Sequence, residues 1–185
     1  MDHFYQNLGE DWFNYQTVYS SVVNKFDNST FVEVGSWKGR SSAYMAVEII
    51  NSGKNIKLHC VDTWLGGVEH QDMDCVKNDS LYQEFLTNIE PVKNVITPIR
   101  LSSVDASKLY EDASLDFVFI DASHEYEDVK NDLAAWYPKI KSGGIFAGHD
   151  FGWDGVYKAL EEFKDSAGIA YKTDQSTYCW AMHKP

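Results

Sequence analysis

The sequence predicts an α/β fold built on a doubly wound, mostly parallel sheet. Short apolar runs rich in β-branched and aromatic residues alternate along the chain with longer segments whose apolar residues recur at helical spacing. Strands separated by helices form parallel sheets with right-handed crossovers. Most of the apolar runs also end on glycine or a polar residue, at the edge of the sheet where such folds bind ligands.

The elements expected in the first part of the chain are a helix over 15–26, a strand over 30–34, a helix over 41–50, a strand over 56–61, a helix over 80–89 and a strand over 95–101. Apolar residues recur three or four positions apart in each helix, as Val18 and Val22 do in the first. The first two strands are short apolar runs that stop at Gly35 and Asp62. Pro98 lacks a backbone donor, so the third strand is expected at the edge of the sheet, or Pro98 at its first position.

The elements expected in the second part are a strand over 115–120, a helix over 126–137, a strand over 145–147, a helix over 155–163 and two β-like runs over 168–172 and 177–182. The run over 115–120 is the clearest strand, because it is almost wholly apolar and stops at Asp121. A turn at Gly143 and Gly144 leads into the next strand, which ends at His149 and Asp150.

Composition indicates a single domain over residues 1–185. A chain of 185 residues that is 44% hydrophobic can form one packed core. A formal charge of -12 without a basic stripe disfavours a nucleic-acid partner. No apolar run is long enough for a membrane span and no basic leader precedes one, so a cytoplasmic protein without a membrane partner is expected. Cys60, Cys75 and Cys179 are too widely spaced for a disulfide framework or a zinc site.

The turn after the first predicted strand has the features of a ligand-binding loop. Gly35 allows close approach of a ligand, and the following helix offers free N–H groups. The dinucleotide motif G-x-G-x-x-G would need glycine at Trp37 and Arg40, and the phosphate-loop spacing is also missing. Asp62 ends the second strand, where a carboxylate can bind ribose hydroxyls. An ordinary turn and a helix cap are the alternatives, but together these residues favour a nucleoside-containing cofactor.

Four motifs resemble those of class I S-adenosylmethionine-dependent methyltransferases, in particular the branch called methyltransferase family 24. They are E-x-G-x-x-x-G-x-S from residue 33, V-D-T-W-x-G from residue 61, D-F-V-F-I-D-A-x-H-x-Y from residue 116 and G-G-I-F-A-G-H-D-F from residue 143. Ala122 departs from the branch, which usually has glycine there. The resemblance implies a seven-stranded sheet with an antiparallel C-terminal hairpin: a helical lead-in over 1–29, a cofactor-binding core over 30–163 and the hairpin over 164–185.

The resemblance also implies a cofactor site for S-adenosylmethionine made of Glu33, Gly35, Ser36, Gly39, Ser41, Asp62, Thr63, Trp64, Ser103 and Asp121. The turn from Glu33 to Gly39 would line the methionine part of the cofactor, and Asp62 would bind its ribose. Thr63 or Trp64, together with Ser103, would contact the adenine. Asp121 would lie near the sulfonium and the methyl acceptor.

Two catalytic routes are open. In the first, Asp121, His149 and Asp150 bind a divalent metal ion that polarises the acceptor hydroxyl, as an Asp, Asp and Asn set does in catechol-type O-methyltransferases. A histidine ligand suits Mn²⁺, Fe²⁺ or Zn²⁺ better than Mg²⁺. In the second, His149 removes the proton as a general base. His124 either takes a direct chemical part, caps the following helix or orients Asp121.

The expected function is therefore O-methylation of a hydroxyl on a small molecule or a carbohydrate. A non-catalytic S-adenosylmethionine-binding module and a nicotinamide oxidoreductase are the competing hypotheses; the polar cluster disfavours the first and the missing glycine motif the second. The aromatic N-terminal stretch, with Phe4, Tyr5, Trp12, Phe13 and Tyr15, is suited to cover either the cleft or a neighbouring subunit of a homo-oligomer.

Overall fold

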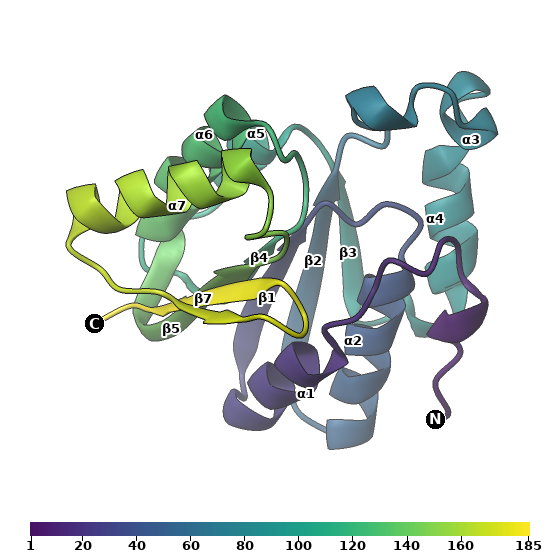
Figure 1. Ribbon diagram of the computed structural model, residues 1–185. Helices are drawn as coiled ribbons and strands as arrows, with labels where there is room; N and C mark the ends of the chain where they lie inside the picture. Colours follow the sequence, from purple (N-terminus) through teal and green to yellow (C-terminus); the bar gives the residue numbers. More distant parts are fainter.

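The computed structural model describes residues 1–185 and contains one seven-stranded sheet with helices on both faces (Figure 1). The strands are β1 (Ser29–Val34), β2 (Ile56–Asp62), β3 (Ile96–Arg100), β4 (Leu115–Ile120), β5 (Ile140–Gly148), β6 (Lys172–Asp174) and β7 (Cys179–His183). Their order in the sheet is β3-β2-β1-β4-β5-β7-β6, and only β7 runs antiparallel to its neighbours β5 and β6. The predicted fold class, with its reversed C-terminal hairpin, is confirmed.

Two layers of helices enclose the sheet. The longer helices are α1 (Gln16–Lys25), α2 (Arg40–Ser52), α4 (Leu81–Ile89), α6 (Tyr126–Trp136) and α7 (Asp154–Ala167); the short ones are α3 (Asp74–Lys77) and α5 (Ser103–Ser107), and 3-10 turns span Tyr5–Asn7, Val68–His70, Glu90–Val92 and Tyr137–Lys139. The layer of α1, α2 and α4 packs on one face of the sheet, and α5, α6 and α7 pack on the other (Figure 1). No helix is long and apolar enough to cross a membrane.

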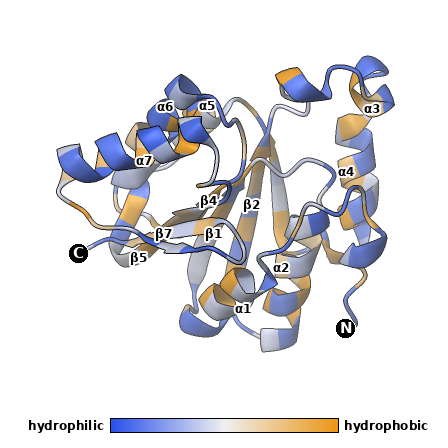
Figure 2. Ribbon diagram, viewed as in Figure 1, coloured by the Kyte–Doolittle hydropathy of each residue, from blue (hydrophilic) through white to orange (hydrophobic).

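The strands are apolar because both of their faces are buried. In β4, Phe117 and Phe119 point into the core under α1 and α2, whereas Val118 and Ile120 point into the core under α6 and α7. Figure 2 shows the result, with apolar strands in the middle and polar stretches along the outer helices. Continuous apolar runs of this kind are typical of parallel strands covered on both sides.

The ends of the central strands meet at the point where the strand order reverses. Strand β1 pairs in parallel with β2 on one side and with β4 on the other. Backbone hydrogen bonds continue beyond the strands: the N–H of Gly35 donates to Val61, at 2.8 Å, and that of Asp121 donates to Val34, at 2.8 Å. The N–H of His149 donates to Ile120 at 3.0 Å. These bonds bring the residues after β1, β4 and β5 side by side at one edge of the sheet.

Some element boundaries differ from the prediction. Strand β5 begins at Ile140, not at residue 145, and the Gly143–Gly144 pair lies within it beside an irregularity in its pairing with β4. Gly168, expected to begin a strand, has a φ of 66° and ends α7 instead. Strand β6 therefore begins only at Lys172. Pro98 lies in β3 at the edge of the sheet, as predicted. The short helices α3 and α5 were not predicted.

The buried carboxyl of Asp132 on α6 should make folding stability depend on pH. Burial raises the pKa of Asp132 to about 7, although Ser103 partly opposes the shift. The folded protein keeps a proton there that the unfolded chain loses, so stability should fall as pH rises from about 4 to about 7, by at most about 4 kcal/mol. In Asp132→Asn this contribution should vanish.

Urea denaturation of both proteins at several pH values checks this prediction. Asp132→Asn and wild type should have similar unfolding free energies near pH 4, and the variant should be more stable near pH 8. A stability difference between the two proteins that stays constant across this range would contradict it.

Candidate functional site

The turn between β1 and α2 comes unusually close to the end of β4. Gly35 has a φ of 89°, in the left-handed region, and Gly39 has a φ of 82° where α2 begins. A Cβ atom at Gly35 would overlap the backbone carbonyl of Asp121. Glycine is therefore required at residue 35, both for its backbone conformation and for the space.

The buried carboxylate of Glu33 stabilises this turn through hydrogen bonds. Glu33, the fifth residue of β1, has no exposed surface. Its side chain accepts hydrogen bonds from the hydroxyls of Tyr19, at 2.8 Å, of Ser36, at 2.8 Å, and of Ser42. Burial raises the pKa of Glu33, and the hydroxyl donors counter part of that rise. Because its oxygens are occupied by these hydroxyls, Glu33 shapes the turn and offers little surface to a ligand; Ser36 and Ser41 are likewise buried.

Asp62, at the end of β2, ties its own loop to the β1–α2 turn. Its Oδ2 atom accepts hydrogen bonds from the backbone N–H groups of Ser36, at 3.0 Å, and Trp37, at 2.9 Å. Its Oδ1 atom accepts one from Trp64 at 2.7 Å. Burial raises the pKa of Asp62, which these backbone donors oppose. The carboxylate thus lies beside the Gly35 turn, as the sequence motifs implied.

The expectation that Trp64 offers its face to an adenine needs correction. The indole is 1% exposed and packs between Tyr82 and Phe85, at ring-centroid distances of 4.6 and 4.7 Å. Its Nε1 donates to the backbone carbonyl of Trp37 at 2.8 Å. Trp64 is therefore a core residue, whereas its neighbour Thr63 remains partly exposed.

Ser103 begins α5, in the loop region that follows β3. It is partly buried, and its hydroxyl accepts a hydrogen bond from Nε1 of Trp136 at 2.9 Å. This hydroxyl is thus engaged by α6, although the residue lies after the same end of the sheet as Thr63.

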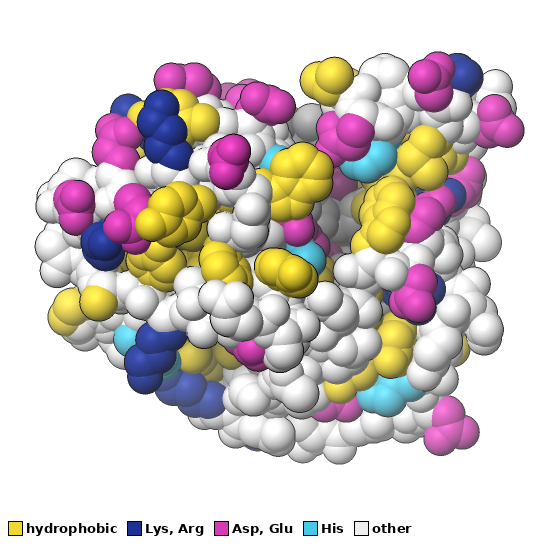
Figure 3. Space-filling view, in the orientation of Figure 1, with side chains coloured by type: hydrophobic (Ala, Val, Ile, Leu, Met, Phe, Trp, Pro, Cys, Tyr) yellow, Lys and Arg dark blue, Asp and Glu magenta, His cyan; other side chains and the backbone are white.

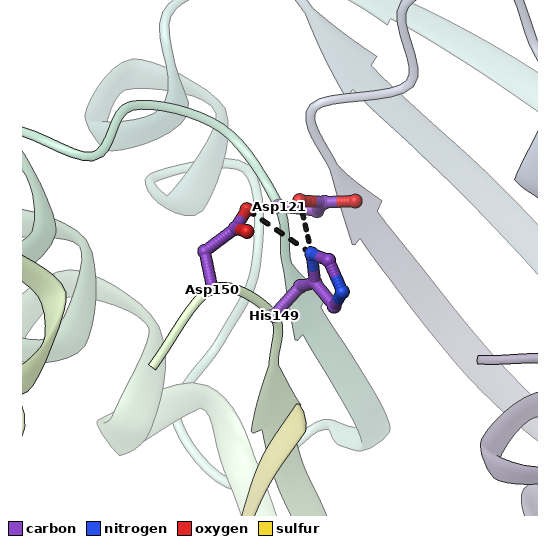
Figure 4. A group of neighbouring side chains, drawn as sticks. All are labelled: Asp121, His149 and Asp150. Atoms are coloured by element: carbon purple, nitrogen blue, oxygen red, sulfur yellow. Dashed lines mark ion pairs between the residues drawn. The ribbon is translucent and has the colours of Figure 1, made fainter. Parts of the chain in front are cut away.

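Asp121, His149 and Asp150 converge after β4 and β5, as predicted (Figure 4). One ligand atom from each lies within 4.8 Å of the others. Nδ1 of His149 is 3.6 Å from Oδ1 of Asp121 and 3.1 Å from Oδ2 of Asp150. Asp150 has a φ of 61°, a left-handed conformation that aspartate tolerates better than most residues. We call this group the Asp–His–Asp cluster.

The electrostatics of the Asp–His–Asp cluster follow from its two carboxylates. Burial lowers the pKa of His149, but hydrogen bonding and attraction to Asp121 and Asp150 outweigh it and raise the pKa to about 10. Burial likewise favours the neutral form of Asp150, but the imidazoles of His124 and His149 lower its pKa well below the ordinary value. The two carboxylates thus stabilise a positive charge beside Nδ1 of His149, and a bound divalent cation would take the place of the imidazole proton.

The N-terminal segment completes the cluster, which the sequence analysis did not foresee. The Tyr15 hydroxyl donates to Oδ2 of Asp121 at 2.6 Å, and its ring lies 5.0 Å from that of His149. Oδ1 of Asn14 is 3.2 Å from Nε2 of His149. Asn14 and Tyr15 of the N-terminal stretch thus lie at the cleft of their own chain, whereas Tyr5 packs on Tyr44 of α2. A contact of the stretch with a neighbouring subunit stays a prediction. The only sequence signal was a polar Asn14 followed by a phenol at the first residue of the helix predicted over 15–26.

His124 supports Asp150 and makes no contact with Asp121 in the hydrogen-bond or ion-pair network. Its Nε2 lies 2.9 Å from Oδ2 of Asp150, and this hydrogen bond raises the pKa of His124. It also does not cap α6, whose N-cap residue is Glu125 and has no side-chain cap. The expectation that His124 caps the helix or orients Asp121 is therefore wrong; it orients Asp150.

Comparison with known proteins places the chain in a recognised family and fold. Residues 32–151 match the family described as a methyltransferase domain. An uncharacterised protein of Sinorhizobium fredii, y4gI, is 25% identical over 129 residues, which is 70% of this chain but 14% of that much longer relative.

Solved structures agree on the fold. The O-methyltransferase NovP superposes with a TM-score of 0.70 at 15% identity, covering 91% of this chain and 77% of NovP. The O-methyltransferase TomG from Streptomyces achromogenes, solved in complex with S-adenosylmethionine, has a TM-score of 0.64 at 13% identity, covering 92% of this chain and 79% of TomG.

The close approach at Gly35 predicts that replacing this glycine by alanine destabilises the protein more than the same replacement at Gly53, although both have left-handed backbone. Gly35→Ala adds the overlap with Asp121 to the backbone strain, so it should lower the free energy of unfolding by at least about 4 kcal/mol. Gly53→Ala is the matched control, because Gly53 also has a positive φ, of 67°, but a Cβ there meets no atom within 4 Å. It should cost about 1 to 2 kcal/mol. Equal losses for the two variants in chemical denaturation would refute the asymmetry.

Proposed function

The chain belongs to the methyltransferase domain family, and on that premise we propose that it transfers a methyl group from S-adenosylmethionine to a hydroxyl oxygen of a small molecule or carbohydrate. The observation that carries the proposal is the convergence of the Gly35 turn, Asp62 and Asp121 at the ends of three adjacent strands. NovP and TomG, which share the fold, are O-methyltransferases, and this supports oxygen as the acceptor atom.

S-adenosylmethionine supplies a methyl group on a sulfonium, which is an excellent leaving group, so the residues of this chain chiefly have to align donor and acceptor. We assign the methionine part to the turn from Gly35 to Gly39 and the start of α2, because the first N–H groups of a helix have no partner within the helix and suit a carboxylate. Asp62 would bind the ribose through its Oδ1 atom, which can accept a further hydrogen bond besides the one from the Trp64 N–H. Thr63 would lie at the adenine, and Glu33 would act by shaping the turn.

Activation of the acceptor falls to the Asp–His–Asp cluster. Two carboxylates and one imidazole nitrogen within 4.8 Å form a donor set that fits Mn²⁺, Fe²⁺ or Zn²⁺. A cation held there would lower the pKa of an acceptor hydroxyl as a Lewis acid. Tyr15 and His124 would hold Asp121 and Asp150 in place by the hydrogen bonds described above. The alternative is His149 acting alone as a general base, for which it would first have to lose the proton that Asp121 and Asp150 stabilise on it. The two routes differ in whether the protein binds a divalent cation.

The cofactor assignment predicts selective loss of affinity at Asp62. Calorimetric titration with S-adenosylhomocysteine, the demethylated product, should show binding to wild type, and Asp62→Asn should weaken it at least about tenfold, since an amide cannot accept from both the turn and a ribose. Asp72→Asn is the control, because the Asp72 side chain is fully exposed in the 65–79 loop. Binding of NAD in place of S-adenosylhomocysteine would contradict the methyltransferase assignment and favour an oxidoreductase.

The metal assignment predicts that the Asp–His–Asp cluster binds Mn²⁺ even when no methyl acceptor is present. Electron paramagnetic resonance should detect one bound Mn²⁺ per chain, and Asp150→Asn should reduce the affinity at least about tenfold by removing a charged ligand. Asp154→Asn, at the start of α7 just beyond the cluster, should bind Mn²⁺ like wild type. If wild type binds no divalent cation, or if the two variants lose affinity equally, His149 is left as the base.

A further inference from the structure

Four aromatic side chains form two stacks, and the carboxylate of Glu69 lies between them. The Trp12 indole stacks on His70 with centroids 5.6 Å apart, and the Trp153 indole stacks on His124 with centroids 4.6 Å apart. Oε1 of Glu69 lies between the stacks, 3.9 Å from Nε2 of His70 and 3.7 Å from Nδ1 of His124. We call Trp12, Glu69, His70, His124 and Trp153 the aromatic clamp.

The two indoles of the clamp are unusually exposed. Trp12 is 52% and Trp153 is 58% exposed, whereas Trp64, Trp136 and Trp180 are at most 1% exposed. Figure 3 shows hydrophobic and histidine side chains on both sides of a hollow in this face of the molecule. Large aromatic side chains left open to water beside a hollow are typical of binding sites.

The clamp adjoins the Asp–His–Asp cluster through His124. The imidazole of His124 contacts both groups: its ring stacks on Trp153, and its Nε2 lies 2.9 Å from Oδ2 of Asp150. Trp153 lies three residues after Asp150, and its N–H donates to the Asp150 carbonyl at 2.9 Å, which closes a turn between the two. A molecule held at the clamp would therefore lie next to the carboxylates that face the acceptor.

The side chains of the clamp suit an uncharged, polyhydroxylated ring. No Lys or Arg takes part in the hydrogen bonds, ion pairs or ring contacts of the five side chains, whereas Glu69 and Asp150 bring negative charge. An anionic group placed next to Glu69 would be repelled. The C–H faces of a saccharide can stack on indoles while its hydroxyls bond to carboxylates and imidazoles. A flat aromatic acceptor would stack too, but it offers fewer hydroxyls than a saccharide to bond to Glu69, His70 and His124.

We propose that the aromatic clamp is the acceptor site and that it binds an uncharged saccharide ring. This inference rests on the proposed function. Trp12 and Trp153 would be its specificity-determining residues, holding the ring by its apolar faces. Glu69 would bond to hydroxyls at its edge, and the hydroxyl to be methylated would point toward Asp121 and Asp150.

Saturation-transfer NMR on the full chain, loaded with S-adenosylhomocysteine, tests this assignment. The probes are the methyl glycosides of glucose, galactose, mannose and rhamnose, with glucose 6-phosphate and catechol for comparison. At least one neutral glycoside should bind, and Trp12→Ala and Trp153→Ala should each weaken it about three- to tenfold. Leu109→Ala, which removes an equally exposed apolar side chain outside the clamp, should leave the affinity unchanged.

The affinity for S-adenosylhomocysteine, measured alongside, separates the two proposals. If wild type does not bind S-adenosylhomocysteine, the proposed function itself fails. If it binds S-adenosylhomocysteine and prefers catechol or glucose 6-phosphate, or binds no probe, the saccharide assignment fails alone. Loss of S-adenosylhomocysteine affinity in either tryptophan variant would also overturn it, because the indoles would then belong to the cofactor site.

Discussion

The contact between the Gly35 turn and the backbone of Asp121 determines how the rest of this edge is built. It arises because β1 and β4 are parallel neighbours whose chain continuations stay hydrogen-bonded after the strands end. A side chain at residue 35 would force the turn away from β4. With the turn in place, Asp62 accepts hydrogen bonds from the N–H groups of Ser36 and Trp37, and the N–H of Asp121 donates to Val34, so both residues flank the Gly35 turn. This is the end of the sheet to which we assign the cofactor.

The carboxylates at the strand ends divide into two kinds according to their partners. Glu33 and Asp62 accept hydrogen bonds from neutral hydroxyl and backbone N–H donors, most of them in the β1–α2 turn, so they stabilise the geometry of that turn. Asp121 and Asp150 are instead paired with ionisable side chains, namely the phenol of Tyr15 and the imidazoles of His124 and His149. Carboxylates of the second kind contact side chains that can themselves ionise, and such coupled groups are the candidates for a functional site.

The strand ends were predictable from the sequence. Strands buried on both faces of the sheet are continuous apolar runs, and most of these runs stop abruptly at glycine or a polar residue. The partners of those residues were not predictable. Tyr15 meets Asp121 across 106 positions of sequence, a contact that no local pattern encodes. Composition alone likewise could not tell the buried indole of Trp64 from the exposed ones of Trp12 and Trp153. Residues 140–144 were missed as strand because two glycines interrupt the apolar pattern there.

A crystal structure with S-adenosylhomocysteine bound tests the central claim most directly. The account predicts the ligand outside the ends of β1, β2 and β4, with its ribose against Asp62 and its sulfur on the side of Asp121. A ligand bound elsewhere, for example in the open groove that Gly9, Lys38 and Asn88 line beside α4, would contradict it.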